Sequence, residues 1–407
     1  MLTSKWGIMT DSITTGPYWD PYHADQREAP YEAWRRLRDE APVYYNEPFD
    51  FYALSRFDDV LNASLDTVSF SSARGITLDS IGEPIPFPIM IMMDPPLHDV
   101  YRKVVNRAYT PRRIAALEER IVELCGEYLD PFVGSGGFNF VTDFGMRLPV
   151  MVISSLLGFP EEDHDQLREW SDMSLHREEG VEGMTPQAQE AMGHTITYYM
   201  EQIALRRENP TGDMISAMLS ADMTTVEGEV RKLDDMEVVG MLALISNAGN
   251  ETVARMLGWA SLVFEEYPDA RKEMVENPEL IPTGIEELLR LEAPSPIQGR
   301  YAAKDIELHG TTIPEGSKVA LLTGSAGRDE RRYPDADVFD LHRKAERHVA
   351  FGYGAHFCLG AALARMEGKV ALEEVFRRFP EWSVDRSAVT YVATNTVRGP
   401  SSVPVSF

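Results

Sequence analysis

One stretch of the chain has the pattern of a single helix of roughly thirty residues, far longer than the average helix of a globular protein. The pattern begins at Asp234, a good N-cap residue, and continues to about Glu266, just before Pro268. At 1.5 Å per residue such a helix is ~45 Å long. Residues Met241–Ser246 are apolar on nearly every face, so we expect this helix to cross the core of the protein.

The sequence Ala248-Gly249-Asn250-Glu251-Thr252 interrupts the apolar pattern of this helix. Glycine and asparagine cost the helix ~1.5 kcal/mol together relative to alanine, and a carboxylate and a hydroxyl follow in an otherwise buried stretch. One interpretation is that there are two helices, the first of which ends at Asn250. The other is a local opening of one helix against a buried site. The absence of a proline favours the second interpretation.

The rest of the pattern is mainly helical, with a few short strands. Helical spacing is found in Tyr31–Glu40, in Pro111–Val133 and in Ala361–Phe379. β-rich residues on either side of a turn predict a hairpin in Val43–Ser55, and alternation predicts short strands in Tyr301–Val319. Because the elements do not alternate as in βαβ units, the sequence predicts a mainly α fold with small β-sheets (α+β) rather than a doubly wound sheet.

No clean domain boundary is visible in the chain, since proline, glycine and charged residues are spread throughout and there is no internal repeat. We expect residues 28–407 to form a single domain whose β-rich part lies near residues 43–56 and 301–320. Residues 1–27 are rich in Thr, Ser, Pro, Tyr and Asp and are expected to form an extended N-terminal arm. Met9 is a candidate for the natural start.

The charge of the chain argues against several classes of function. Its 407 residues include 39 Lys and Arg against 65 Asp and Glu, a formal net charge of −26, and 43% are hydrophobic. Such a chain buries a core, and its charge argues against broad nucleic-acid binding and against docking on anionic membranes. The longest apolar stretches, near Leu148–Phe159 and Val238–Ser246, are shorter than the ~20 residues of a membrane span. We expect a soluble, cytoplasmic monomer.

The two cysteines, Cys125 and Cys358, exclude a disulfide framework and a Cys-rich zinc or iron–sulfur site, and fit a reducing cytoplasm. Cys358 lies in the loop Phe351–Gly360, which is apolar except for His356 and precedes a predicted helix. The loop glycines permit close approach of another body, and free N–H groups at a helix start stabilise a thiolate. A dinucleotide-binding loop is discounted because the third glycine of that motif is missing.

Three interpretations of Cys358 remain open on the residues alone. It can be an inert core cysteine, the usual fate of a lone cysteine. It can be a nucleophile with His356 as its base, although two residues apart in a loop is poor geometry and no orienting Asp or Asn is evident. It can also be the single axial thiolate ligand of a haem iron.

Several further motifs favour the haem interpretation. They are Asp94-Pro95-Pro96-Leu97-His98 with Arg102, Ala248-Gly249-Asn250-Glu251-Thr252, Glu287-Leu288-Leu289-Arg290 with Arg343, Arg300, and the signature of Phe351, Gly354, Cys358 and Gly360. In this set and order the sequence resembles the cytochrome P450 family, the haem-thiolate monooxygenases, in its bacterial soluble form. The resemblance extends from about residue 20 to the C-terminus. Glu251 stands where aspartate is commoner, a variant that the family tolerates.

The resemblance implies the cytochrome P450 fold, with haem b (iron protoporphyrin IX) between the long helix and the cysteine loop. Cys358 would be the proximal ligand of the metal, and Phe351 would pack against the ring near the sulfur. Ala248 and Gly249 would border the site where O₂ binds. The buried haem propionates need positive partners. For this role the resemblance implies His98, Arg102, Arg300 and His356.

Two other groups of residues receive roles from the same resemblance. Thr252 and Glu251 are the implied catalytic residues: the hydroxyl donates to the bound oxygen or places water near it, and the carboxylate relays protons from solvent. Glu287, Arg290 and Arg343 are expected to form a buried salt-bridge network beneath the haem. This network would hold the fold and take no part in the chemistry.

The activity that the resemblance implies is monooxygenation, in which O₂ is activated with two electrons and a hydrophobic small molecule is hydroxylated. The substrate is expected to be terpenoid, steroid or fatty-acid-like. A ferredoxin and a ferredoxin reductase would supply the electrons, because the chain has no reductase domain. One alternative is a biosynthetic tailoring oxidase that epoxidises, couples or desaturates; another is a haem protein that binds a ligand without turnover. The Glu251–Thr252 pair disfavours the latter.

Substrate contacts and the docking face complete the set of expectations. The candidate substrate residues, several of them in the proline-containing loop Gly75–Ile91, are Thr77, Leu78, Phe87, Ile91, Ala243, Leu244, Asn247, Pro296, Ile297, Gln298 and Val397. The docking face for the ferredoxin is expected to be basic despite the net charge, on the cysteine side of the haem. Its candidate residues are Arg102, Lys103, Arg112 and Arg113 on one stretch, and Arg365, Lys369, Arg377 and Arg378 on the helix after Cys358.

Overall fold

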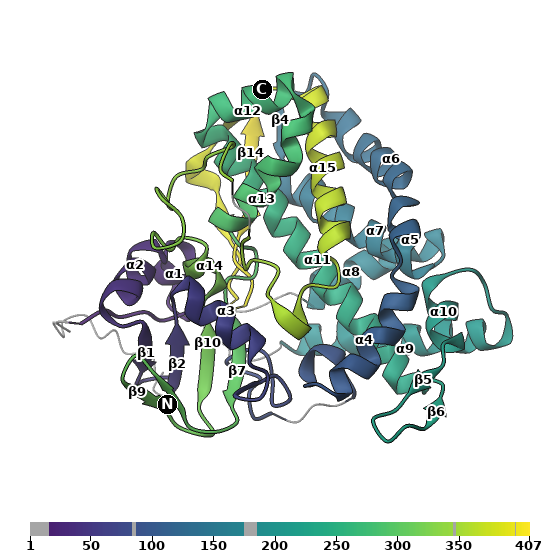
Figure 1. Ribbon diagram of the computed structural model, residues 1–407. Coiled ribbons are helices and arrows are strands. Elements are labelled where there is room, and N and C mark those ends of the chain that lie inside the picture. Colours follow the sequence, from purple (N-terminus) through teal and green to yellow (C-terminus); the bar gives the residue numbers. More distant parts are fainter. Residues whose placement is uncertain (1–15, 84–86, 175–184, 345–346, 395) are drawn as a thin grey trace, which may run out of the picture.

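Helix α11, Asp235–Glu266, passes through the middle of the molecule (Figure 1). The structure is a computed structural model that describes residues 16–83, 87–174, 185–344, 347–394 and 396–407. The Asp234 side chain accepts a hydrogen bond from the Glu237 amide, and the Glu237 carboxylate accepts one from the Asp234 amide, each at 2.8 Å. This capping box starts the helix where the sequence predicts it, and the predicted end at Glu266 is confirmed as well.

The backbone of α11 is helical throughout the segment Ala248–Thr252, so the alternative of two helices is wrong. The expected local opening is also absent from the backbone. The Thr252 hydroxyl donates to the Ala248 carbonyl at 2.8 Å, one turn earlier in the helix. At Gly249 a Cβ would lie 2.7 Å from the side chain of Ile153, which packs there from helix α7 (Arg147–Leu157). The helix therefore accommodates these residues through side-chain contacts rather than through a break.

A five-stranded sheet lies on one side of the molecule, at the lower left of Figure 1. Its strand order is β1 (Val43–Asn46), β2 (Phe51–Leu54), β10 (Lys318–Leu321), β7 (Gln298–Ala302) and β3 (Phe70–Ser71). All neighbours are antiparallel except β2 and β10, which are parallel. The predicted hairpin in residues 43–55 is confirmed, and so are short strands within residues 301–319.

Helices make up most of the remaining molecule, and α7, α9, α13 and α15 all contact α11. The other α-helices are α1 (Ala24–Glu28), α2 (Tyr31–Glu40), α3 (Phe57–Leu65), α4 (Leu97–Ala108), α5 (Pro111–Ala115), α6 (Glu118–Leu129), α8 (His164–Ser174), α9 (Pro186–Glu208), α10 (Met214–Ser220), α12 (Pro268–Glu276), α13 (Ile281–Leu291), α14 (Thr323–Ala326) and α15 (Ala361–Arg378). Single turns are η1 (Met90–Met92), η2 (Asp130–Phe132), η4 (Glu161–Asp163), η5 (Pro278–Leu280), η6 (Gly354–His356) and η7 (Arg386–Ala388), and η3 (Phe140–Gly145) is a π-helix. The minor strands are β4 (Gly137–Asn139), β5 (Met223–Thr224), β6 (Val230–Arg231), β8 (Ile306–Leu308), β9 (Thr311–Ile313), β11 (Ser383–Val384), β12 (Thr390–Tyr391), β13 (Pro400–Ser402) and β14 (Pro404–Ser406).

The described part of the expected N-terminal arm is packed rather than extended. Trp19 is 1% exposed, and its ring meets that of Phe51 edge-on at 5.8 Å. The Asn46 amide donates to the Trp19 carbonyl at 2.9 Å, and α1 forms a short helix within the same stretch. The Trp19 ring thus packs against the sheet. The composition of this stretch, which is rich in turn residues, does not predict that packing. Met9 lies outside the described residues.

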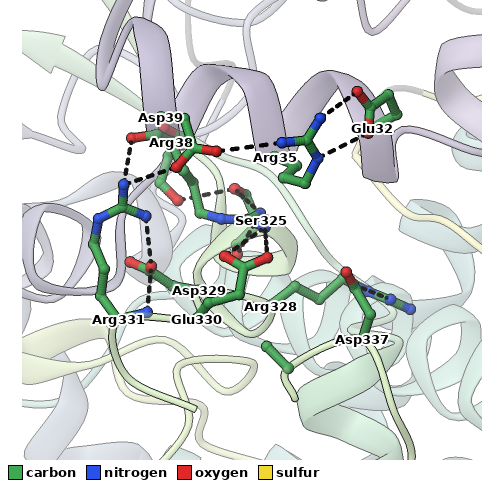
Figure 2. A network of polar contacts seen from close by, with 12 residues as sticks. Glu32, Arg35, Arg38, Asp39, Ser325, Arg328, Asp329, Glu330, Arg331 and Asp337 are labelled. Atoms are coloured by element: carbon green, nitrogen blue, oxygen red, sulfur yellow. Dashed lines mark hydrogen bonds and ion pairs between the residues drawn. The ribbon is translucent and has the colours of Figure 1, made fainter. Parts of the chain in front are cut away.

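A network of ion pairs joins α2 to the segment that follows α14 (Figure 2). The guanidinium of Arg38, 1% exposed, lies 3.1 Å from the Glu330 carboxylate and 3.2 Å from the Ser325 hydroxyl. Asp39 pairs with Arg331 at 2.8 Å. These contacts link residues almost 300 positions apart in sequence, and they fix α2 to the half of the chain that carries the cysteine loop.

Among the described residues, one helical stretch, Phe140–Leu157, is long and apolar enough to match a membrane span, and 67% of it is buried inside the structure. It consists of η3 and α7, and both of these elements pack against α11. The core helix of a folded domain satisfies the same criterion of length and composition, so the stretch is accounted for by core packing.

Candidate active site

The loop that carries Cys358 faces α11 across a cavity of about 250 Å³. The Cys358 amide donates to the Phe351 carbonyl at 2.9 Å, and Gly352 and Gly354 have positive φ angles of 67° and 69°. At Gly354 a Cβ would also lie 2.8 Å from the Ser64 carbonyl oxygen. The glycines therefore fold the loop tightly, and both Cys358 and Phe351 line the cavity.

The surroundings of Cys358 suit a metal ligand better than a free nucleophile. Burial raises the pKa of the Cys358 thiol, whereas the N–H groups at the start of α15 and the guanidiniums of Arg102 and Arg365 act in the opposite direction. The helix start stabilises the thiolate as expected, but burial has the larger effect on the pKa of the thiol. A bound metal ion deprotonates a coordinating thiol outright. Within the described residues no hydrogen bond joins His356 to the thiol; its ring packs against that of His98 instead.

Four basic side chains gather at one edge of the cavity. They are His98 and Arg102 on α4, Arg300 on β7 and His356 in the cysteine loop. The rings of His98 and His356 have centroids 4.5 Å apart, and the Nε2 of His356 is buried without a hydrogen-bond partner in the described part of the chain. Arg102 and Arg300 donate to backbone carbonyls at 2.9 and 2.7 Å, and in that same part neither has a carboxylate within 4 Å.

This edge of the cavity fits an anionic group. Burial lowers the pKa of Arg300 to about 10, with Asp94 acting in the opposite direction, so the guanidinium is charged at neutral pH. Burial, followed by the charges of Arg300, His98 and Arg102, lowers the pKa of His356 to about 3. His356 therefore offers a neutral N–H donor rather than the positive charge that the sequence suggested. Two buried or half-buried arginines with two imidazoles match the two carboxylates of a haem.

The opposite wall is one face of α11. Ala248, Gly249 and Thr252 line the cavity, and Ala248 is exposed to it although most of the helix is buried. A small apolar surface of this kind accepts a flat ring. Glu251 is half-buried and lies outside the lining, next to Thr252. Of the expected acid–alcohol pair, Thr252 thus lines the cavity and Glu251 lies outside it.

Glu287, Arg290 and Arg343 form a buried network, as the family resemblance implies. Arg290 lies 2.7 Å from the Glu287 carboxylate, and both side chains are at most 1% exposed. Arg343 reaches the same carboxylate at 2.9 Å. Arg290 also donates to the carbonyls of Gly327 and Ala336, each at 2.6 Å. The network joins α13 to the chain that leads to the cysteine loop.

Among the cavity residues that the sequence did not identify, Tyr109 and Glu367 carry polar groups. Glu367 is 1% exposed, its Oε2 has no hydrogen-bond partner in the described part of the chain, and burial raises its pKa well above the ordinary value. The helical spacing could have identified Glu367 as buried, because it is four residues after Leu363 and four before Ala371, and both of these lie on the buried face of α15. A carboxylate on an apolar helix face indicates a group kept neutral inside the protein.

A family model described as Cytochrome P450 matches residues 150–389. The chain is 40% identical over 391 residues to the protein described as cytochrome P450 123 of Mycobacterium tuberculosis, covering 95% of this chain and 96% of the relative. The chain belongs to the cytochrome P450 family. Cytochrome P450 enzymes are monooxygenases that contain haem iron, and the cysteine loop, the basic edge and the α11 face lie where such a group fits.

Two further relatives extend the comparison to enzymes with a stated substrate or ligand. The cytochrome P450 chain is 33% identical to the vitamin D(3) 25-hydroxylase of Pseudonocardia autotrophica, covering 100% of this chain and 98% of the relative. The crystal structure of CYP109E1 from Bacillus megaterium in complex with corticosterone superimposes with a TM-score of 0.83 at 31% identity, covering 94% of this chain and 99% of that chain.

The expected substrate residues of this cytochrome P450 divide into two groups. Ile91, Leu244 and Gln298 line the cavity. Outside the lining lie Thr77, Leu78, Phe87, Ala243, Asn247, Pro296, Ile297 and Val397. Leu78 is 3% exposed and packs with Trp34 in the core beside the sheet. Pro296, Ile297 and Val397 surround a separate hollow of only about 10 Å³. Pro84 and Pro86 of the loop lie outside the described residues.

Proposed function

We propose that this cytochrome P450 hydroxylates a hydrophobic small molecule of the terpenoid, steroid or fatty-acid type. The observation that carries the proposal is one cavity that holds a cysteine at a helix start, a basic edge and a threonine on the opposite helix. The walls add Met90, Ile91, Leu244 and Ile245, which are apolar, and the amide of Gln298. The names of the vitamin D hydroxylase and of the corticosterone complex support a steroid-like substrate.

The residues of this chain that would hold haem b are those at the cavity edge. Cys358 would coordinate the iron, and Arg102 and Arg300 would neutralise the two propionates. His98 and His356 would donate hydrogen bonds to the same carboxylates. When bound, the haem supplies an iron that binds and activates O₂, and thiolate donation favours cleavage of the O–O bond. Phe351, which stacks under the guanidinium of Arg365 at 4.5 Å, would keep water away from the sulfur.

Proton delivery is proposed to run through Thr252 and Glu251. The Thr252 hydroxyl has one proton, and it is donated to the Ala248 carbonyl. The hydroxyl oxygen can therefore accept a hydrogen bond from the cavity side, which favours the alternative in which it holds a water molecule over direct donation. Glu251, outside the lining, would pass protons from the surface to this water.

The experiment that tests the function is turnover in ¹⁸O₂. The purified haem protein, a surrogate ferredoxin and its reductase would be supplied with a library of steroids, terpenoids and fatty acids, and products would be examined by mass spectrometry. The proposal expects a product with one ¹⁸O atom on a formerly unactivated carbon. Oxidised products without ¹⁸O would instead indicate coupling or desaturation, and an absence of any product across the library would favour ligand binding without turnover.

An external ferredoxin with its reductase is the proposed electron source, docking near α4 and α5. Lys103 and Arg112 are exposed, and among the described residues no ion pair engages either of them. Arg113 has a different role, since it donates to the Ala108 and Gly212 carbonyls at 2.7 and 3.0 Å. Unpaired cations on an acidic molecule give local attraction for an acidic partner.

The second expected group of docking cations, on α15, contributes less charge. Each of its members has a carboxylate partner: Arg365 with Glu286 at 2.6 Å, Lys369 with Glu373 at 3.3 Å, Arg377 with Glu374, and Arg378 with Asp130 at 2.6 Å. Because these pairs are locally neutral, we place the attraction for the electron donor on α4 and α5 rather than on α15.

A further inference from the structure

Gly240, in the second turn of α11, lies directly against the backbone of the segment that begins at Phe87. A Cβ at position 240 would lie 1.8 Å from the Pro88 carbonyl oxygen, a distance that real Cβ atoms never show, and 3.4 Å from the Phe87 ring. The obstacle is a backbone oxygen, so no side-chain rotation can relieve the contact. The Pro88 backbone therefore occupies the space that any other residue at position 240 would fill with its side chain.

The same segment continues into the wall of the cavity. Met90, 3% exposed, and Ile91 both line the cavity, two and three residues after Pro88. The far end of the segment is anchored at Asp94, whose carboxylate accepts hydrogen bonds from the Ser72 amide at 2.8 Å and from the Ser71 hydroxyl at 2.5 Å. With that end anchored, the contact at Gly240 decides how close Met90 and Ile91 come to the helix.

On the helix side, the neighbours of Gly240 also face the cavity. Leu244 follows Gly240 by four residues and so shares its face of α11, and both Leu244 and Ile245 line the cavity. Leu244 and Ile245 on the helix and Met90 and Ile91 on the facing segment therefore border the same gap. The contact of Gly240 with Pro88 closes one end of this gap.

We propose that Gly240 is a positioning residue that determines substrate selection by seating the Pro88 carbonyl against α11. It sets the width of the cavity between Leu244 on the helix and Ile91 on the facing segment. This inference rests on the proposed function in one respect, namely that haem and substrate bind in this cavity. The selection is by ligand size, because a gap held at a fixed width discriminates against ligands that are bulky near the α11 face.

The direct test is Gly240→Ala in the haem-loaded protein. The methyl group must move the Pro88 oxygen from 1.8 Å to 3.0 Å or more, and the segment can yield only away from the helix, which widens the gap. Spectral titration with imidazole, which is small, and with clotrimazole, which is bulky, gives two dissociation constants. The ratio of the imidazole constant to the clotrimazole constant is expected to rise about tenfold, the scale of discrimination by a methyl group in an apolar pocket. Hydrogen exchange in residues 87–93 is expected to become faster.

Two matched variants separate positioning from general destabilisation. Gly258 is a buried glycine of the same helix, where a Cβ would lie 2.7 Å from the Pro400 side chain and 3.1 Å from that of Val141, outside the cavity lining. Gly258→Ala is expected to lower thermal stability and to leave the ratio unchanged. Gly193 lies inside α9 with open space around it, so Gly193→Ala is expected to leave the ratio unchanged and to raise thermal stability slightly, because alanine favours a helix more than glycine does.

Three outcomes would overturn the inference. One is a folded Gly240→Ala protein with the wild-type ratio and wild-type exchange, and another is an equal change of ratio in Gly258→Ala. If Gly240→Ala does not fold, Pro88→Gly is the variant to use, because it loosens the same segment without altering the helix. The third outcome is a Pro88→Gly protein whose ratio of dissociation constants and whose hydrogen exchange are both those of the wild type. Failure of the wild-type protein to bind haem would instead refute the proposed function, and it would leave the exchange comparison, which needs no haem, to judge Gly240.

Discussion

Thr252 illustrates, at the scale of single residues, how one contact defines a role. Its hydroxyl proton is donated within the helix at 2.8 Å, so the side chain faces the cavity as a hydrogen-bond acceptor. In the proposed mechanism, an acceptor at this position would hold a water molecule in place and would not supply a proton of its own. The proton would then come along a chain of water, for which we propose the half-buried Glu251, the adjacent acid on the helix, as the source.

Replacing Thr252 by alanine is expected to uncouple electron consumption from product formation. Electrons should still be consumed at a similar rate, but they should leave mainly as hydrogen peroxide, and product per reducing equivalent should fall about tenfold or more. The measurement compares consumption of the reduced nicotinamide cofactor with peroxide and product formed. Thr252→Ser keeps the hydroxyl and should retain most of the coupling. An unchanged yield in Thr252→Ala would show that the proton path runs elsewhere.

The residues that the sequence identifies are those whose chemistry depends on type and local order. Cys358 stands out because a thiol before a helix start in a glycine-rich loop is distinctive within ten residues of sequence. The neutral state of His356 is different, because it follows from burial and from Arg300, which lies more than fifty residues earlier. For Glu367 the local spacing on α15 indicates burial, but its place in the cavity depends on elements that are distant in sequence.

At the scale of elements, one carboxylate of α13 links that helix to α15 and to the segment before the cysteine loop. Glu286 accepts hydrogen bonds from Arg365 at 2.6 and 2.8 Å, and its carboxylate lies 3.1 Å from the His348 imidazole. Burial alone would raise the pKa of Glu286, but the hydrogen bonds and charges of Arg365 and His348 lower it to about 2. The folded protein therefore favours the ionised carboxylate.

The stabilising effect of Glu286 is expected to depend on pH. The folded pKa of about 2 lies below the ordinary value of 4.5, so the contribution is fully present above pH 4.5 and is lost as the pH falls towards 2. Glu286→Gln should reduce the free energy of unfolding by about 1–2 kcal/mol at pH 7, after allowance for solvent screening. Urea unfolding between pH 7 and pH 3 should show this difference shrinking. A difference that stays constant with pH would contradict the assignment.

Most individual elements follow from local signals, and their assembly does not. The N-cap at Asp234 and the apolar pattern predict α11 almost to the residue. The predicted helix in residues 111–133, however, is divided into α5, α6 and η2. No glycine or proline marks the division after Ala115, where Ile114 and Leu117 pack into one core cluster. The parallel pairing of Leu54 with Leu321 has no local signal at all, because the strands are far apart in sequence.

At the scale of the whole molecule, the net charge of −26 hides an uneven distribution. The cations of α15 are offset by carboxylates, whereas Lys103 and Arg112 are exposed without an ion pair in the described part of the chain. The sequence predicts that basic residues gather on two stretches, but it does not show which of them have acidic neighbours. Those neighbours, such as Asp130 for Arg378, come from other elements.

Charge reversal at Arg112 is expected to slow reduction by an acidic ferredoxin. Arg112→Glu should lower the reduction rate several-fold at low ionic strength and weaken its salt dependence, because steering depends on unscreened charge. The haem spectrum should not change. Arg377→Glu, at an exposed position already paired with Glu374, is the matched control and should have a smaller effect. If stopped-flow reduction at low salt is the same in wild type and Arg112→Glu, the partner docks elsewhere.

The central claim is that Cys358 holds a haem iron as its thiolate ligand, and the spectrum of the reduced carbon-monoxide complex tests it most directly. Fresh wild-type protein is expected to show the strongly red-shifted Soret band of thiolate ligation. Cys358→Ala should lose this band, and Cys125→Ala should keep it, because Cys125 is fully buried in the apolar face of α6. A band at the position typical of histidine ligation in undenatured wild-type protein, or an unchanged band in Cys358→Ala, would contradict the claim.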